Sequence, residues 1–197
     1  MSSESQAAIH DLLDRLDRGD RSALDELFPI VYSELNALAH RLRLKWQGDY
    51  TLNTTALLHE GYLKLAKQHT LHAETRTHFL ALASKAMRHI LVNYARDRRA
   101  QKRGGDLTRV TFADSVFAGT PMALNTQQAE KLVALDDALD ELEDVDPRQG
   151  KVVECRFFGG MTVEETAEAL GVSARTVKRD WAIAQAWLQR AIERAGA

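Results

Sequence analysis

The fold of this chain is decided by residues 162–189, which read TVEETAEALGVSARTVKRDWAIAQAWLQ. Thr162 can cap a helix, and Glu165 three residues later can reach back to the cap residue, the pattern of a capping box. The short helix that follows should end at Gly171, because glycine adopts the left-handed turn that residues with a Cβ resist. Ser173 can then cap a second, longer helix. Two helices joined by a glycine turn of this length are typical of the helix-turn-helix, a motif that reads DNA.

The second of these helices carries a basic face. Arg175, Lys178 and Arg179 are spaced i, i+3 and i+4, so they share one side of the helix. Val177 and Trp181 fall on another side, where they can pack inward. Helical hairpins also occur in proteins that never bind DNA, and an exposed basic face is often only solvated. The combination of capping box, turn glycine and basic triplet favours DNA binding over that alternative.

The composition restricts the class of protein. Of the 197 residues, 45% are hydrophobic, enough to form one large or two small cores. The chain has no apolar run near ~20 residues, so no membrane-spanning helix is expected, and its polar N-terminal stretch does not resemble a secretory signal. The single cysteine, Cys155, excludes an internal disulfide and a cysteine-based zinc site, and we expect it to be a small buried hydrophobe. We therefore expect a cytoplasmic protein with no metal site and no cofactor.

Charge is distributed unevenly along the chain, although the net charge is only −2. Residues 85–103 contain seven basic residues and one acid, Asp97. Residues 106–148 contain ten acids and three basic residues. A concentrated basic stretch is what contacts with nucleic-acid phosphates require. The acidic segment is either a soluble linker or a means of limiting unspecific binding to nucleic acid.

Hydrophobic periodicity predicts an all-α protein. Apolar residues recur at three- and four-residue steps through most of residues 9–94 and again from residue 132 onward. Pro29 is expected to kink or divide its helix, and Asp146-Pro147 to start another. We predict two helical domains, residues 1–105 and 126–197, joined by a flexible linker over residues 106–125. The second domain should be a four-helix unit that contains the helix-turn-helix.

A basic helical domain, a linker and a C-terminal helix-turn-helix domain together resemble one family. This is the extracytoplasmic-function group of bacterial sigma factors, the two-domain members of the sigma-70 family. Residues 149–189 resemble the domain of that family that binds the promoter −35 element, and residues 79–103 resemble the helix that melts and holds the −10 element. The resemblance implies a transcription initiation factor that binds core RNA polymerase, at its clamp and flap, and directs promoter recognition. The polymerase would perform the chemistry, so we expect this chain not to be an enzyme.

The same resemblance implies which residues contact promoter DNA. At the −35 element they are Arg175, Thr176, Lys178 and Arg179. Arginine can read guanine through two hydrogen bonds, whereas lysine more often contacts phosphate. At the −10 element, where bases are unstacked and the backbone must be held, they are Arg88, His89, Asn93, Arg96, Arg98 and Arg99. The loop at residues 67–78 would capture an extruded base, although its His69, His72 and His78 are equally compatible with a solvated loop.

The helix that would dock on the polymerase clamp departs from the family pattern. In this family it usually opens with an acidic tetrapeptide resembling Asp-Ala-Glu-Asp, whereas this chain has Asn53-Thr54-Thr55-Ala56. Glu60 remains as a carboxylate, and the apolar residues of the helix can still pack against the partner. The implied polymerase-binding residues are Asn53, Thr55, Leu58, Glu60 and Leu63.

Two explanations fit the missing carboxylates. In the first, docking relies on apolar contacts and on hydrogen bonds from asparagine and threonine. In the second, phosphorylation supplies the charge, because a phosphothreonine adds roughly −1.5 to −2 charges and a helix N-terminus tolerates them best. This pattern resembles a branch of the family that is switched by Ser/Thr protein kinases. The candidate acceptors are Thr51, Thr54 and Thr55; we favour Thr51, just outside the helix, with Arg41, Arg43 and Lys45 as the cations that would meet its phosphate.

Two other functions compete with a sigma factor. A free-standing helix-turn-helix regulator would bind DNA without polymerase, but it gives no reason for the basic stretch at residues 85–103. For an enzyme, His59-Glu60 matches the start of a zinc-protease HExxH helix, but Leu63 stands where the second histidine would be. No phosphate-binding glycine loop or nucleophile motif is present. The expected partners are therefore core RNA polymerase and promoter DNA, with a Ser/Thr protein kinase as a further candidate and no membrane.

Overall fold

The computed structural model describes residues 3–45, 54–68, 71–102 and 126–195. Its α-helices are α1 (Ser3–Asp17), α2 (Ser22–Lys45), α3 (Thr54–Ala66), α4 (Arg76–Lys102), α5 (Thr126–Val145), α6 (Pro147–Val153), α7 (Val163–Leu170) and α8 (Ala174–Ala195). A π-helical turn, η2 (Glu154–Phe158), continues α6. The described ranges contain no β-strand, which confirms the prediction of an all-α fold. Among these helices, none has the length and apolar character needed to cross a bilayer. The predicted linker, residues 106–125, lies outside the described residues.

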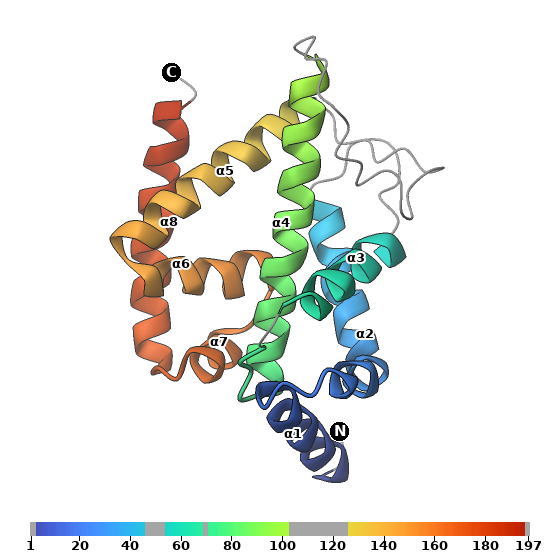
Figure 1. Ribbon diagram of the computed structural model, residues 1–197. Coiled ribbons are helices and arrows are strands. Elements are labelled where there is room, and N and C mark those ends of the chain that lie inside the picture. Colours follow the sequence, from blue (N-terminus) through green and yellow to red (C-terminus); the bar gives the residue numbers. More distant parts are fainter. Residues whose placement is uncertain (1–2, 46–53, 69–70, 103–125, 196–197) are drawn as a thin grey trace.

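Helix α4 lies in the middle of the molecule (Figure 1). Helices α2 and α3 pack against it from one side, and α5, α7 and η2 pack against it from the other. Helix α8 packs against α5, α6 and α7, which completes the C-terminal group of helices. The helices before and after the predicted linker are therefore in contact with each other, a point that the sequence left open.

The helix-turn-helix of α7 and α8 forms as its sequence predicts. The backbone N–H of Glu165 donates to Thr162 Oγ1 (3.1 Å), and the N–H of Thr162 donates to Glu165 Oε2 (2.7 Å). Helix α7 ends at Gly171, whose φ of 62° is left-handed. The backbone N–H of Thr176 donates to Ser173 Oγ (3.1 Å) at the start of α8. The capping box, the turn and the second cap are confirmed, and together they satisfy backbone groups that helix ends leave unpaired.

Helix α6 is capped at its start, and the turn η2 that follows it carries the side chains of Glu154 and Phe158 into the interior. Asp146 caps α6 as predicted, accepting hydrogen bonds from the backbone N–H groups of the two residues after Pro147. In η2, Glu154 and Phe158 are 4% and 1% exposed. The π-helical turn also brings Gly159 close to its own chain, so a Cβ there would lie 2.6 Å from the carbonyl oxygen of Cys155. Only glycine fits this position without a shift of the backbone.

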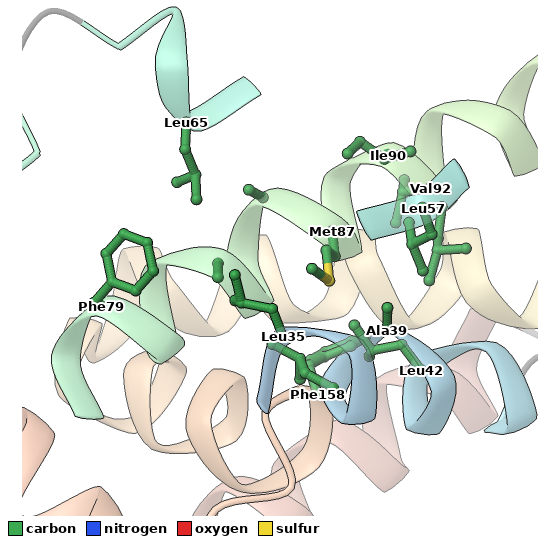
Figure 2. Packing of buried hydrophobic residues seen from close by; sticks show 14 of the residues in the cluster. Leu35, Ala39, Leu42, Leu57, Leu65, Phe79, Met87, Ile90, Val92 and Phe158 are labelled. Carbon is green, nitrogen blue, oxygen red and sulfur yellow. The ribbon is translucent and has the colours of Figure 1, made fainter. Parts of the chain in front are cut away.

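A single cluster of buried side chains runs through both groups of helices. It includes Leu35 and Leu42 of α2, Met87 of α4 and Phe158 of η2, which Figure 2 shows in one group. Next to Phe158, Arg41 Nη2 of α2 donates a hydrogen bond of 2.8 Å to the carbonyl oxygen of Gly159. The C-terminal helices thus share their core with the N-terminal ones.

Helix α2 is continuous through Pro29, so the proline does not divide it. Leu27 and Val31 on either side of the proline are fully buried, and they belong to a stripe of eight buried residues along this helix. Burial of one such side chain contributes about 1.5–3 kcal/mol, whereas a proline inside a helix costs about 3 kcal/mol. Tertiary packing of this buried stripe therefore outweighs the tendency of the proline to break the helix.

Candidate nucleic-acid and polymerase interfaces

The basic face of α8 is open to solvent. Arg175, Lys178 and Arg179 are all exposed. Thr176 is half-buried, and its hydroxyl forms a hydrogen bond of 2.9 Å with Ser173 Oγ, so it is partly used by the cap. A helix presented in this way by a helix-turn-helix can enter the major groove of DNA with its first turns toward the bases.

A buried carboxylate fixes α8 against α6. Asp180 is 1% exposed and accepts hydrogen bonds from Arg148 Nε (2.6 Å) and Arg179 Nε (3.1 Å). Burial alone raises the pKa of Asp180, but the two guanidinium groups outweigh burial and hold this pKa below its ordinary value. The next residue of α8, Trp181, has the guanidinium carbon of Arg156 in η2 lying 5.6 Å from the centre of its ring. These contacts hold the recognition helix with its basic face outward.

The predicted −10 face of α4 is covered at Arg88. This side chain is 1% exposed. Its Nη1 donates a hydrogen bond of 2.6 Å to Asp136 Oδ1 of α5, and its Nε lies 2.9 Å from Glu154 Oε2 of η2. The second contact lacks the alignment of a hydrogen bond and is an ion pair only. The guanidinium carbon also lies 5.4 Å from the centre of the Phe158 ring. In this arrangement Arg88 cannot reach DNA.

Two further basic residues of α4 pair with acids of α5. Lys85 Nζ lies 3.5 Å from Glu143 Oε2. Arg96 Nη2, two turns beyond Arg88, lies 3.1 Å from Asp136 Oδ2 and 2.8 Å from Asp137 Oδ1. These acids were not among the predicted site residues. The available signal was the excess of acids in residues 106–148, which the sequence could assign only to a soluble linker or to a means of limiting unspecific binding to nucleic acid.

The rest of the predicted −10 set lies at different depths on α4. His89 is half-buried beside Arg88, whose Nη2 lies 3.1 Å from His89 Nε2. Asn93 is exposed. Arg98 and Arg99 belong to α4, but their side chains lie outside the described part of the structure. Of the predicted −10 residues, Arg88 and Arg96 therefore lie against α5, whereas Asn93 is open to solvent.

Burial shifts the protonation of the groups around Arg88. It raises the pKa of Glu154 to about 7, although the positive charge of Arg88 opposes this shift. Burial raises the pKa of Asp136 in the same way, again against Arg88. For His89, burial and then the charge of Arg88 lower the pKa to about 4. Glu154 and His89 therefore titrate over overlapping ranges of pH, with opposite effects on stability.

Two substitutions should separate these effects. The pKa of Glu154 is raised from 4.5, so its contribution to stability is complete below pH 4.5 and is lost as the pH rises to about 7. The pKa of His89 is lowered from 6.5, so its contribution is complete above pH 6.5 and is lost as the pH falls to about 4. We expect the free energy of unfolding of Glu154→Gln to rise with pH through this range, and that of His89→Gln to fall. Urea unfolding at several pH values measures both, and slopes of the same sign in the two variants would contradict the assignment.

A cavity of about 650 Å³ lies between α4 and the C-terminal helices. His78 and Lys85 line it from α4, and Lys151 and Cys155 line it from α6 and η2. Cys155 is 1% exposed, and burial raises the pKa of its thiol to about 12. The prediction that this cysteine is a buried hydrophobe is confirmed, and a thiol with so high a pKa is a poor nucleophile.

The first turn of α3 carries the accessible part of the predicted polymerase site. Thr54 is half-buried and Thr55 is exposed. No acidic residue lies in this first turn. Thr51 and Asn53 lie outside the described residues.

Further along α3, the other predicted polymerase-binding residues turn inward. Leu58 is 2% exposed and belongs to the core cluster. Glu60 is 7% exposed, and within the described ranges its Oε1 has no hydrogen-bond partner. Leu63 is half-buried. Leu58 is thus a structural residue here, and of these three only Leu63 has appreciable surface for a partner.

The loop before α4 shows how its histidines are used. His72 pairs with Asp17 of α1. His78 belongs to α4 and is half-buried, and His69 lies outside the described residues. Across the described ranges, no group of three His, Cys, Asp or Glu side chains is arranged to hold a metal ion.

Comparison with known proteins identifies the family. A family model described as ECF sigma factor matches residues 6–194. Neither the curated proteins nor the solved structures include a match to this chain. Members of this family are regulatory transcription factors that bind core RNA polymerase and promoter DNA. Because the match spans nearly the whole chain, this protein belongs to the ECF sigma factors and is an alternative sigma factor that acts in promoter recognition.

Proposed function

We propose that this sigma factor reads promoters at two separate elements. At the −35 element, α8 lies in the major groove with Arg175, Thr176, Lys178 and Arg179. At the −10 element, α4 holds the opened strand with His89, Asn93, Arg96, Arg98 and Arg99, and with Arg88 once α5 and η2 no longer cover it. The observation that carries the proposal is the exposed basic face of α8, presented by a capped helix-turn-helix in a chain that the family model matches over residues 6–194.

The proposed roles divide along the chain. Residues 1–105 bind core polymerase and the −10 element, residues 126–197 bind the −35 element, and residues 106–125 link the two. The polymerase clamp receives the N-terminal part and the flap receives the C-terminal part. The packing of α8 against α5, α6 and α7 supports a C-terminal unit with its own set of contacts.

Single substitutions on α8 test the −35 assignment. We expect Arg175→Ala to cost about 1–3 kcal/mol of promoter binding by the holoenzyme and to relax the preference for the base that it reads. Lys178→Ala should weaken binding to all sequences alike. It should also reduce the slope of log affinity against log salt concentration by about one. Arg190→Ala is the matched control, because this exposed residue removes the same charge about three helical turns beyond Arg179, away from the first turns of α8. Equal effects of all three changes would contradict the assignment.

Docking on the polymerase clamp is assigned to the N-terminal end of α3 and the residues before it, with Asn53, Thr55, Leu58, Glu60 and Leu63 as the proposed contacts. Exposed Thr55 and half-buried Leu63 offer direct surface, while buried Leu58 and Glu60 would act by holding the helix in shape. The absence of acids from the first turn leaves the positive end of the helix dipole without a charge partner on this helix. Negative charge added there is stabilised.

Phosphorylation by a Ser/Thr protein kinase is the proposed source of that charge. The candidates are Thr51, Thr54 and Thr55, of which we favour Thr51. The end of α2 offers the cations: Arg41 and Lys45 donate to backbone carbonyl groups, and none of the three cations at residues 41–45 pairs with a carboxylate in the described structure. A phosphate would therefore be the first full negative charge that they meet.

The test is binding to core RNA polymerase by the full chain, unmodified and with phosphothreonine installed at Thr51. We expect binding to tighten about tenfold or more on modification, because one to three charge-assisted hydrogen bonds are gained. Replacement of Thr51, Thr54 and Thr55 together by alanine should abolish the kinase-dependent gain in transcription. Equal binding of both forms would keep the sigma factor and reject the switch at Thr51. Absence of binding in either form would favour the free-standing helix-turn-helix regulator.

A further inference from the structure

We propose that Asp180 is a positioning residue of the recognition helix α8, which turns the side chain of Arg179 toward the DNA backbone and leaves base reading by arginine to Arg175. The inference rests on the proposed role of α8 at the −35 element, and it divides that role among the basic residues of the helix. Asp180 is buried, so it cannot contact DNA itself. It acts through the arginine that precedes it in the chain.

The two arginines of the basic face are held in different ways. The Nε and Nη2 atoms of Arg179 each lie 3.1 Å from Asp180 Oδ1. Arg175 lies one turn earlier on the same face and is exposed, and its side chain has no hydrogen bond or ion pair with the part of the chain that the structure describes. One edge of the Arg179 guanidinium is therefore occupied before DNA binds, whereas the guanidinium of Arg175 is free to turn.

The position of Asp180 gives the direction in which Arg179 is held. The other carboxylate oxygen of Asp180 accepts a hydrogen bond of 2.6 Å from Nε of Arg148, near the start of α6. Asp180 thus lies on the side of α8 that packs against α6, and it draws the guanidinium of Arg179 toward that flank of the helix. A recognition helix in the major groove has base edges in front of it and a sugar-phosphate strand along each flank. A cation held at the flank meets phosphate.

Arg179 keeps enough charge and enough donors for a phosphate. Its side chain is 62% exposed. One carboxylate serves two guanidinium groups, so Arg148, Asp180 and Arg179 together keep one positive charge in excess. A guanidinium also has more N–H donors than the contact with Asp180 uses. The remaining donors of Arg179 can therefore bind one phosphate of the backbone while Asp180 stays in place.

Asp180 in this way limits how many bases the helix reads. Reading of guanine requires two donors of an arginine to align with O6 and N7 of the base. Arg175 can adopt this alignment, whereas the free donors of Arg179 are held out of line with the base edges. Specificity depends on the contacts that a surface prevents as well as on those that it makes. Removal of the carboxylate should release Arg179 to read a further base.

The test measures promoter binding by the holoenzyme of the full-length chain with core RNA polymerase. Duplexes carry a randomised −35 element, so sequencing of the bound fraction gives the base preference at each position. The slope of log affinity against log salt concentration measures the phosphate contacts. The variants are Arg179→Ala, Asp180→Asn and the two changes combined. Arg175→Ala is the matched control, because it removes the same side chain from the same face one turn earlier.

We expect Arg179→Ala to reduce the slope by about 0.9, the value for one phosphate, and to leave every base preference unchanged. Arg175→Ala should abolish the preference at one position. Asp180→Asn retains the shape of the side chain and the charge of Arg179, so the slope should stay the same. A new preference for guanine, about fivefold, should appear at one position. This preference should disappear in the combined variant, which shows that Arg179 causes it.

Loss of an existing base preference in Arg179→Ala would overturn the inference and keep the proposed role of α8. An Asp180→Asn protein with the circular dichroism of the parent but without a new preference would also overturn it, because a residue that only packs α8 on α6 gives that result. If Asp180→Asn does not fold, the exposed Arg179→Ala alone decides between backbone and base. No change of preference or slope in either arginine variant would reject the role of α8 at the −35 element together with the inference.

Discussion

Replacement of Arg88 by methionine is expected to lower the free energy of unfolding by about 3–5 kcal/mol, because it leaves the buried Glu154 without its cation and the buried Asp136 with Arg96 alone. Both partners, Asp136 and Glu154, are less than a tenth exposed, so water cannot take over the role of the guanidinium. The loss should be larger near pH ~8 than near pH ~5. Without the cation, the buried Glu154 must take up a proton when the protein folds, and this uptake costs more free energy at the higher pH. Urea unfolding at the two pH values measures the effect.

Arg96→Met is the matched control for this prediction. Arg96 pairs with the same Asp136, but its side chain is 47% exposed. Exposed ion pairs contribute about 0–1 kcal/mol, so this variant should lose no more than that at either pH. Equal losses in the two variants would mean that burial of Arg88 does not govern the stability of this contact.

Truncation of Phe158 to alanine is expected to destabilise the protein by about 3–5 kcal/mol, the cost of removing a buried aromatic ring from a core. Phe158 is 1% exposed and belongs to the cluster that joins α2, α4 and the C-terminal helices (Figure 2). Because the cluster is shared, both groups of helices should lose stability together. With the third tryptophan removed by Trp46→Phe, fluorescence of Trp181 and Trp187 follows the C-terminal helices. It should therefore change at the same urea concentration as far-UV circular dichroism, which follows the whole chain.

The neighbouring Phe157 provides the control in the same turn of η2. It is half-buried, and its ring lies 3.7 Å from the ammonium of Lys45. A cation–π contact at such a site contributes about 0.5–2 kcal/mol, so Phe157→Ala should cost clearly less than Phe158→Ala. Two separate unfolding transitions in the Phe158 variant would show that the two groups of helices do not depend on one core.

The features that the sequence predicted well act over a few residues. The capping box of Thr162 and Glu165, the left-handed Gly171 and the cap at Asp146 each satisfy backbone groups within one helical turn. Such signals do not depend on the rest of the fold. The all-α architecture and the helix-turn-helix could therefore be predicted from the sequence alone.

The features that the sequence did not predict depend on distant segments. Arg88 was taken for a surface residue, yet it lies on the stripe of α4 that also carries Ser84, Leu91 and Ala95, all fully buried. Its spacing from these residues was visible as i−4, i+3 and i+7, but the charge masked the signal. The partners that make its burial possible lie 48 and 66 residues further along the chain, beyond the reach of periodicity. For the same reason the sequence left open that α2 continues through Pro29, because the buried stripe that holds it is a tertiary feature.

The position of Cys155 gives the chain an intrinsic chemical reporter. It is the single thiol of the sequence, and it faces the cavity between α4 and the C-terminal helices. Its raised pKa and its burial both slow alkylation in the folded molecule. An opening of this cavity would expose the sulfur, so the rate of labelling by a thiol reagent would follow the population in which η2 and α4 are apart. The exposure of this thiol can thus be measured in the natural sequence without an introduced probe. The same measurement applies to the free protein, to its complex with polymerase and to its complex with DNA.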